Sequence, residues 1–234
     1  MSANVDFAEV QKFEDLASRW WDPTGEFKPL HKINPLRTDY INLHSPVTGL
    51  KVLDVGCGGG LVSEALASFG ADVKGIDMGE APLNVAKLHL LESGLEVDYE
   101  RITAEELAKQ TPETYDVITC LEMLEHVPKP ASVIKACADM LKPDGTIYFS
   151  TINRNPKAWL LAVVGAEYVL NMLPKGTHEY DKFIKPSKLA EYIRAANAEL
   201  LDTKGIFYNP ITHNASLNND LGVNYIIHAR KPSQ

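Results

Sequence analysis

Residues 52–60 read Val52-Leu53-Asp54-Val55-Gly56-Cys57-Gly58-Gly59-Gly60, an apolar strand pattern that meets an acid and then four glycines in five positions. A helix pattern follows at 61–69, and a second strand pattern ends at Asp77. Glycine lets the backbone approach a ligand closely and adopt conformations that a side chain would forbid. A glycine-rich loop between a strand and a helix N-terminus is typical of nucleotide-binding sites, so we expect a nucleotide-like ligand here.

The residues around this loop indicate which ligand it holds. The dinucleotide fingerprint G-x-G-x-x-G would need its third glycine at position 61, where the chain has Leu61. Asp54 stands just before the turn, and a carboxylate there suits a cationic ligand end, such as an amino group, better than a pyrophosphate. Asp77 ends the next strand, where a carboxylate can accept both hydroxyls of a ribose. The alternative is a structural glycine turn beside solvated acids.

Length and composition limit the function classes. With 234 residues, the chain is predicted to be a single domain over 1–234. The net charge of −8 argues against a general nucleic-acid binder, and we expect no nucleic-acid partner. The three cysteines have neither metal-type nor disulfide-type spacing, which indicates a reducing compartment. Residues 1–6 lack the features of a signal peptide, so we expect a cytoplasmic location.

Strand and helix patterns alternate from residue 51 onward. This alternation predicts an α/β, Rossmann-like fold, a mostly parallel seven-stranded sheet with helices on both faces and one antiparallel strand near the C-terminus. The expected strands are 51–55, 71–77, 96–102, 114–120, 145–152, 200–208 and 223–230. The expected helices between them are 61–69, 81–93, 103–110, 130–141 and 187–197.

Two segments stand outside this alternation. Residues 1–46 form an N-terminal extension, with an amphipathic helix expected over 5–21 and a Pro-punctuated, loop-rich stretch over 22–46. Residues 154–186 form an insertion whose run 158–173 is mostly apolar but too short for a membrane span. We expect this insertion to be a lid or a membrane contact; a buried core helix is the alternative.

A third group of polar residues follows the fourth expected strand. The segment 120–128 contains Glu122, Glu125 and His126, and it should face the same crevice as the glycine loop because ligands lie beyond the carboxyl ends of strands. Two carboxylates and an imidazole suit Mg²⁺ or a similar divalent ion. Alternatively, Glu125 and His126 orient the loop, or His126 acts alone as a base.

Taken together, the glycine loop, Asp77 and the 120–128 segment resemble the class I S-adenosylmethionine-dependent methyltransferases. A closer resemblance, to the ubiquinone-biosynthesis O-methyltransferases, rests on blocks that span most of the chain. Those blocks are Ser18-Arg19-Trp20-Trp21-Asp22, Gly25-Glu26-Phe27-Lys28-Pro29-Leu30-His31, Ile33-Asn34-Pro35-Leu36-Arg37, the 120–128 segment, Ser150-Thr151-Ile152-Asn153-Arg154-Asn155 and Pro174-Lys175-Gly176-Thr177-His178.

The resemblance implies a cofactor, a substrate and a set of site residues. S-adenosylmethionine is the implied cofactor, and the residues expected to bind it are Arg37, Asp54, Gly56, Gly58, Asp77, Met78 and Leu121. The implied reaction methylates phenolic or catechol hydroxyls of polyprenylated ubiquinone precursors. The resemblance also implies a peripheral association with the membrane and, for some family members, a divalent ion at Glu122, Glu125 and His126. Other ubiquinone-biosynthesis proteins are further expected partners.

The reaction requires a group that removes a proton from the phenol. A phenol with a pKa of about 10 is a poor nucleophile until its proton leaves, so a base or a metal is needed. His126 is the first candidate, as the base or as a metal ligand, with Glu122 and Glu125 as the other expected catalytic residues. His178 is the second candidate, and a surface histidine is the alternative for it. The basic residues that flank the apolar insertion predict contact with anionic lipid. An NAD-dependent oxidoreductase and a non-catalytic membrane-bound scaffold are the rival functions.

Overall fold

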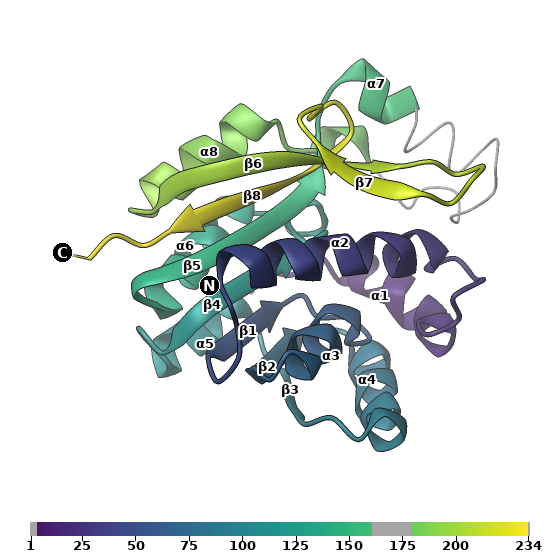
Figure 1. The fold of residues 1–234 in the computed structure, drawn as a ribbon, viewed down its shortest axis with the longest axis horizontal. Coiled ribbons are helices and arrows are strands. Elements are labelled where there is room, and N and C mark those ends of the chain that lie inside the picture. Colours follow the sequence, from purple (N-terminus) through teal and green to yellow (C-terminus); the bar gives the residue numbers. More distant parts are fainter. Residues whose placement is uncertain (1–3, 161–178, 234) are drawn as a thin grey trace.

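The computed structural model describes residues 4–160 and 179–233, and one eight-stranded sheet forms its centre (Figure 1). The strand order is β3-β2-β1-β4-β5-β8-β6-β7. Strands β1 to β5 run parallel, whereas β8 is antiparallel to both β5 and β6, and β7 is antiparallel to β6. The strands are β1 (Lys51–Val55), β2 (Asp72–Asp77), β3 (Val97–Arg101), β4 (Tyr115–Leu121), β5 (Leu141–Ile152), β6 (Glu199–Tyr208), β7 (Ala215–Asn218) and β8 (Asn224–Arg230).

Helices cover both faces of this sheet (Figure 1). One face packs against α2 and α3, and the opposite face packs against α5, α6 and α8, each through its own cluster of buried apolar side chains. The α-helices are α1 (Phe7–Leu16), α2 (Lys28–His44), α3 (Leu61–Ser68), α4 (Glu80–Ser93), α5 (Ala104–Gln110), α6 (Pro130–Met140), α7 (Pro156–Ala158) and α8 (Pro186–Ala195). The short 3-10 helices are η1 (Ala17–Arg19), η2 (Leu124–His126) and η4 (Tyr180–Lys182).

The predicted α/β fold is confirmed, with one strand more than the seven expected. The additional strand is β7, which pairs with β6 over Gly205–Tyr208 as a hairpin. Its four residues are too few for a period-2 pattern to stand out in the sequence. Familiar capping residues delimit two of the helices: Thr103 and Glu106 form a capping box at α5, and Gly94 ends α4 in the left-handed conformation.

Helix α2 corrects the prediction that 22–46 is loop-rich. Pro29 lies in the first turn, where proline is tolerated, but Pro35 lies inside the helix, where it removes a hydrogen bond at a cost of about 3 kcal/mol. The helix forms because its buried residues recur at helical spacing and pack against the sheet, as Ile33 and Ile41 do. The expected helix over 5–21 is also divided, into α1 and η1.

His228 on β8 makes stability depend on pH. Its side chain is buried and stacks on the ring of Tyr148 with centroids 4.6 Å apart. Burial, followed by the repulsion from His44, lowers the pKa of His228 from 6.5 to about 4. Between these values the unfolded chain binds a proton that the folded protein excludes, so stability falls as pH drops through this window.

We expect His228→Phe to flatten this pH dependence, because phenylalanine keeps a ring against Tyr148 without a titratable group. Wild-type protein should lose up to about 3 kcal/mol of unfolding free energy to this residue between pH 6.5 and pH 4. Urea denaturation at a series of pH values measures how the unfolding free energy of each protein changes with pH. The same pH dependence in the wild-type protein and in His228→Phe would contradict the assignment of this effect to His228.

Candidate active site

A cavity of about 310 Å³ opens at the carboxyl ends of β1, β2 and β4. Helices α1 and α2 contribute the wall that faces the strand ends. Apart from His178, which lies outside the described residues, the cavity lining includes all the residues that the sequence predicts for the site, namely Arg37, Asp54, Gly56, Gly58, Asp77, Met78, Leu121, Glu122, Glu125 and His126. The structure therefore brings the glycine loop, Asp77 and the 120–128 segment together around one cavity.

The glycine loop between β1 and α3 requires glycine at Gly58 for two reasons. Its φ angle is +52°, in the left-handed region that side chains rarely adopt. A Cβ atom at this position would also overlap the indole ring of Trp20, which packs over the loop from the N-terminal extension. The Gly58 amide donates a hydrogen bond to Oδ2 of Asp77 at 2.9 Å.

The Asp77 carboxylate is fixed by backbone amides at the end of β2. Oδ2 accepts from the Gly58 amide, and Oδ1 accepts from the Gly79 amide at 2.7 Å. Burial raises the pKa of Asp77, and these backbone hydrogen bonds oppose that rise. Because each carboxylate oxygen has about two acceptor sites, both oxygens can still accept a ligand hydroxyl.

Asp54 is almost completely buried, and both of its carboxylate oxygens already have partners within the protein. Its two carboxylate oxygens accept hydrogen bonds from the hydroxyls of Ser63 (2.7 Å) and Thr119 (2.8 Å), and the residue is 2% exposed. Burial raises the pKa of Asp54, whereas those hydroxyls lower it. The carboxylate thus ties β1 to α3 and β4 and places negative charge at the base of the cavity.

Arg37 on α2 supplies a buried positive charge on the opposite wall. Its Nη2 donates to Asn34 at 3.2 Å, and its Nη1 lies 3.9 Å from Oε1 of Glu122. Burial lowers the pKa of Arg37, and the nearby carboxylates of Glu122 and Asp54 oppose this shift. Its buried Nε has no hydrogen-bond partner among the described residues. A buried donor without an acceptor is costly, so this guanidinium suits an anionic ligand group.

The predicted metal cluster is not supported, because its three side chains are directed to different partners. Glu122 accepts hydrogen bonds from Ser150 (2.6 Å) and Asn224 (2.8 Å), and Glu125 accepts one from Thr151 at 2.8 Å. Within residues 4–160 and 179–233, no group of three or more His, Cys, Asp or Glu side chains could hold a metal ion. The sequence predicted the correct residue types near one another, but side-chain direction decides coordination.

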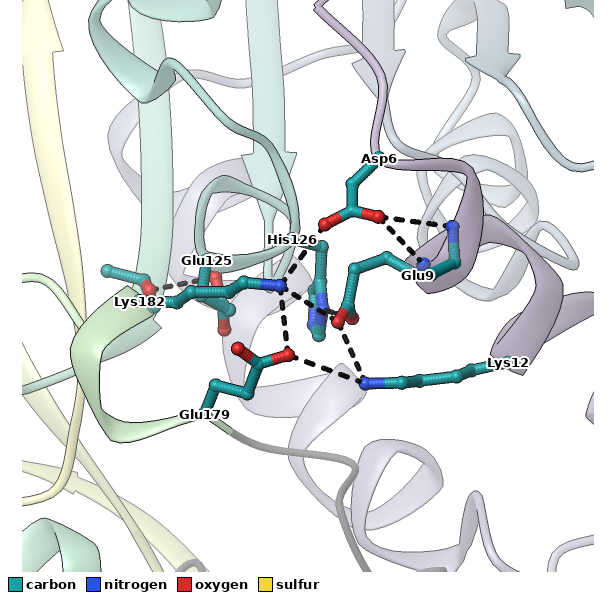
Figure 2. A network of polar contacts seen from close by, with 9 residues as sticks. Asp6, Glu9, Lys12, Glu125, His126, Glu179 and Lys182 are labelled. Carbon is teal, nitrogen blue, oxygen red and sulfur yellow. Dashed lines mark hydrogen bonds and ion pairs between the residues drawn. The ribbon is translucent and has the colours of Figure 1, made fainter.

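His126 lies at the end of η2, beside Glu9 of α1 (Figure 2). Its Nδ1 is 2.8 Å from Oε2 of Glu9. The ring of Phe13 meets the imidazole edge-on, with centroids 5.0 Å apart. Across the described part of the chain, no group hydrogen-bonds to Nε2 of His126, so this nitrogen is the one available to a ligand.

Glu9 and Trp20 line the cavity, although neither was expected there from the sequence. Both belong to the N-terminal extension, and no local pattern relates them to strand ends more than 30 residues away. Thr103, which follows β3, also lines the cavity and was not expected there. Its position at a strand end, next to β2 in the sheet, is a signal that could have identified it.

Comparisons with known proteins identify the family. Residues 14–203 match a family model described as a methyltransferase domain. A protein of Saccharophagus degradans named ubiquinone biosynthesis O-methyltransferase is 65% identical over 229 residues, which is 97% of each chain. A protein of Hahella chejuensis with the same name is 62% identical and covers 98% of this chain and 96% of its own. The chain belongs to the ubiquinone biosynthesis O-methyltransferase family.

Solved structures support the fold independently of the sequence. Magnesium protoporphyrin IX methyltransferase from Synechocystis, solved with bound S-adenosylhomocysteine, superposes with a TM-score of 0.63 over 99% of this chain and 90% of its own, at 18% identity. A possible histamine N-methyltransferase from Thermotoga maritima gives a TM-score of 0.68 over 95% of this chain and 99% of its own, at 17% identity.

The family membership confirms several predictions from the sequence. The chain is an O-methyltransferase that depends on S-adenosylmethionine, and the alternative of an NAD-dependent oxidoreductase is wrong. His178 and most of the predicted lid lie outside the described residues. Among those described, no helix is both long and apolar enough to cross a bilayer.

Proposed function

We propose that this enzyme methylates a phenolic or catechol hydroxyl of polyprenylated ubiquinone precursors, of the 2-polyprenyl-6-hydroxyphenol and 3-demethylubiquinol types. The observation that carries this proposal is the composition of the cavity. Its lining combines the buried guanidinium of Arg37, the carboxylate of Asp77 at a position suited to ribose hydroxyls, and the imidazole of His126. The names of the relatives support the ubiquinone context.

The residues on two sides of the cavity fit S-adenosylmethionine, which supplies an electrophilic methyl group on a sulfonium when it is bound. Asp77 would accept the ribose hydroxyls, and Arg37 would donate to the carboxylate of the amino-acid end through its unpaired Nε. The negative charge of Asp54 favours the ammonium group at that end. Gly56 and Gly58 allow close approach, and Met78 and Leu121 give apolar walls.

His126 would remove the acceptor's proton. Glu9 lies against Nδ1, so the free Nε2 would accept the hydrogen of the phenolic hydroxyl and leave a phenolate. Glu122 and Glu125 would shape this end of the cavity through their hydrogen bonds to β5 and β8. The cavity wall beside these two glutamates would hold S-adenosylmethionine and the phenolic acceptor next to each other. In a methyl transfer, this orientation of the two reactants supplies much of the reduction in the activation barrier.

The proposal predicts that methyl transfer needs no divalent ion. A short-chain prenylated catechol and labelled S-adenosylmethionine should give an O-methyl product at the same rate with and without excess EDTA, because this proposal assigns removal of the phenolic proton to the His126 imidazole. Mass spectrometry of the product is the measurement, and enzyme without acceptor is the control. Lost turnover that Mg²⁺ restores would bring back the metal prediction. Intact catechol after many expected turnovers would contradict the substrate class.

Peripheral association with anionic lipid, and contact with other ubiquinone-biosynthesis proteins, remain predictions. Trp159 and Leu160, at the start of the insertion, are 44% and 54% exposed, which supports an apolar contact. The basic flank is weaker than its sequence indicates. Lys157 pairs with Asp220 at 2.6 Å, and Lys188 pairs with Glu191 at 2.7 Å.

A further inference from the structure

We propose that Glu9 is the positioning residue of His126, and that Lys182 on η4 holds the Glu9 carboxylate in place. This inference rests on the proposed role of His126 as the base. It adds a carboxylate that orients the base and comes from the N-terminal extension, which does not contribute a strand end to the site. Glu9 and His126 are separated by 117 positions in the chain.

The two oxygens of Glu9 have separate partners (Figure 2). Oε2 lies 2.8 Å from Nδ1 of His126. Oε1 accepts from Nζ of Lys12 at 2.8 Å and from Nζ of Lys182 at 3.0 Å. Because the lysines hold one oxygen, the carboxylate cannot rotate freely, and the other oxygen stays aimed at the imidazole.

The charge of Glu9 fits an acceptor for an N–H group. Glu9 is 3% exposed, and burial alone would raise its pKa. Hydrogen bonds from His126, Lys12 and Lys182 outweigh that effect and hold the pKa of Glu9 below its ordinary value. An ionised carboxylate accepts only, so the neutral imidazole must carry its hydrogen on Nδ1 and present the lone pair of Nε2 to the cavity.

Lys182 connects this pair to the chain that returns from the insertion. It lies on η4 and contacts Oδ2 of Asp6 (3.3 Å) and Oε1 of Glu179 (3.1 Å) in addition to Glu9. Asp6 in turn caps α1 with its other oxygen, which accepts from the amides of Ala8 and Glu9. The N-terminus of α1 and η4 are therefore joined at the point where His126 is oriented.

The competing explanation is that Glu9 only docks α1 against the molecule. A docking role predicts a loss of stability or of cofactor affinity, whereas a positioning role predicts a specific loss in kcat and a defined histidine tautomer. The matched control is Asp15→Asn, because Asp15 is an exposed carboxylate on the same helix whose side chain hydrogen-bonds to Gln11 and not to His126.

The first test compares kinetics. Glu9→Gln should lower kcat by about 10- to 100-fold, part of the 10²–10⁴-fold that a general base supplies, with little change in KM or in S-adenosylhomocysteine affinity. Asp15→Asn should keep wild-type kcat. In the double variant of Glu9→Gln with His126→Ala, kcat should equal that of His126→Ala alone. A normal kcat in Glu9→Gln, with His126→Ala impaired, would overturn the inference and leave the proposed function standing. A normal kcat in His126→Ala would instead remove the proposed base.

The second test reads the tautomer in the wild-type enzyme, so its result does not depend on how Glu9→Gln folds. Nitrogen-15 NMR of the histidine-labelled wild-type enzyme, with His126 assigned by its loss in His126→Ala, reports which ring nitrogen carries the hydrogen. We expect Nδ1–H in the neutral imidazole. An Nε2–H tautomer would overturn the inference whatever the kinetics show.

Discussion

We expect Asp77→Ala to bind S-adenosylhomocysteine about 10²–10⁴-fold more weakly than the wild-type enzyme. Two hydrogen bonds from ribose hydroxyls to a charged acceptor would be lost, at about 1.5–3 kcal/mol each. The effect has a second source, because the amides of Gly58 and Gly79 would lose their acceptor and the glycine loop would lose its anchor. Isothermal titration calorimetry measures the change.

Two further variants separate these sources. Asp77→Asn keeps an acceptor oxygen for one amide, so it should retain more loop order than Asp77→Ala while still losing the negative charge. Asp72→Ala removes an exposed carboxylate at the other end of β2 and should leave affinity unchanged. Wild-type affinity in Asp77→Ala would show that this carboxylate does not hold the ligand.

The parallel half of the sheet could be predicted from the sequence because its signals are local. Buried strands such as β1 and β4 are rich in apolar residues, and glycines and caps mark the helices between them. Helix α2 could not be predicted in this way. Pro35 locally disfavours a helix. The helix forms because residues on its buried face, such as Ile41, pack against the sheet and outweigh the cost of the proline.

The site follows the same division between local and long-range information. The sequence was enough to place Gly56, Asp77 and His126 at the cavity, because they lie at or after the carboxyl ends of neighbouring parallel strands, which meet at one edge of the sheet. The sequence was not enough to predict the directions in which the side chains point. Glu125 is directed to Thr151 on β5, and Glu9 reaches His126 from an extension whose sequence has no catalytic pattern. These contacts depend on how distant segments pack.

The largest kinetic effect should come from His126. We expect His126→Ala to lower kcat by about 10²–10⁴-fold, the usual contribution of a general base, because the phenol would have to lose its proton to water. Affinity for S-adenosylhomocysteine should stay near the wild-type value, since the groups proposed to bind the polar ends of the cofactor, Asp54, Asp77 and Arg37, lie on β1, β2 and α2. His213→Ala is the matched control, because His213 contacts Lys28 and Tyr208 and does not line the cavity.

The acidity of the acceptor makes this prediction specific. A base matters less when the phenol already ionises at the assay pH, so a nitro-substituted catechol should narrow the gap between the His126→Ala variant and the wild-type enzyme. Single-turnover rates across a series of substituted catechols measure that gap. A deficit that stays constant across the series would indicate that His126 shapes the cavity and does not take the proton. A deficit that shrinks with acceptor pKa assigns the proton transfer to this imidazole.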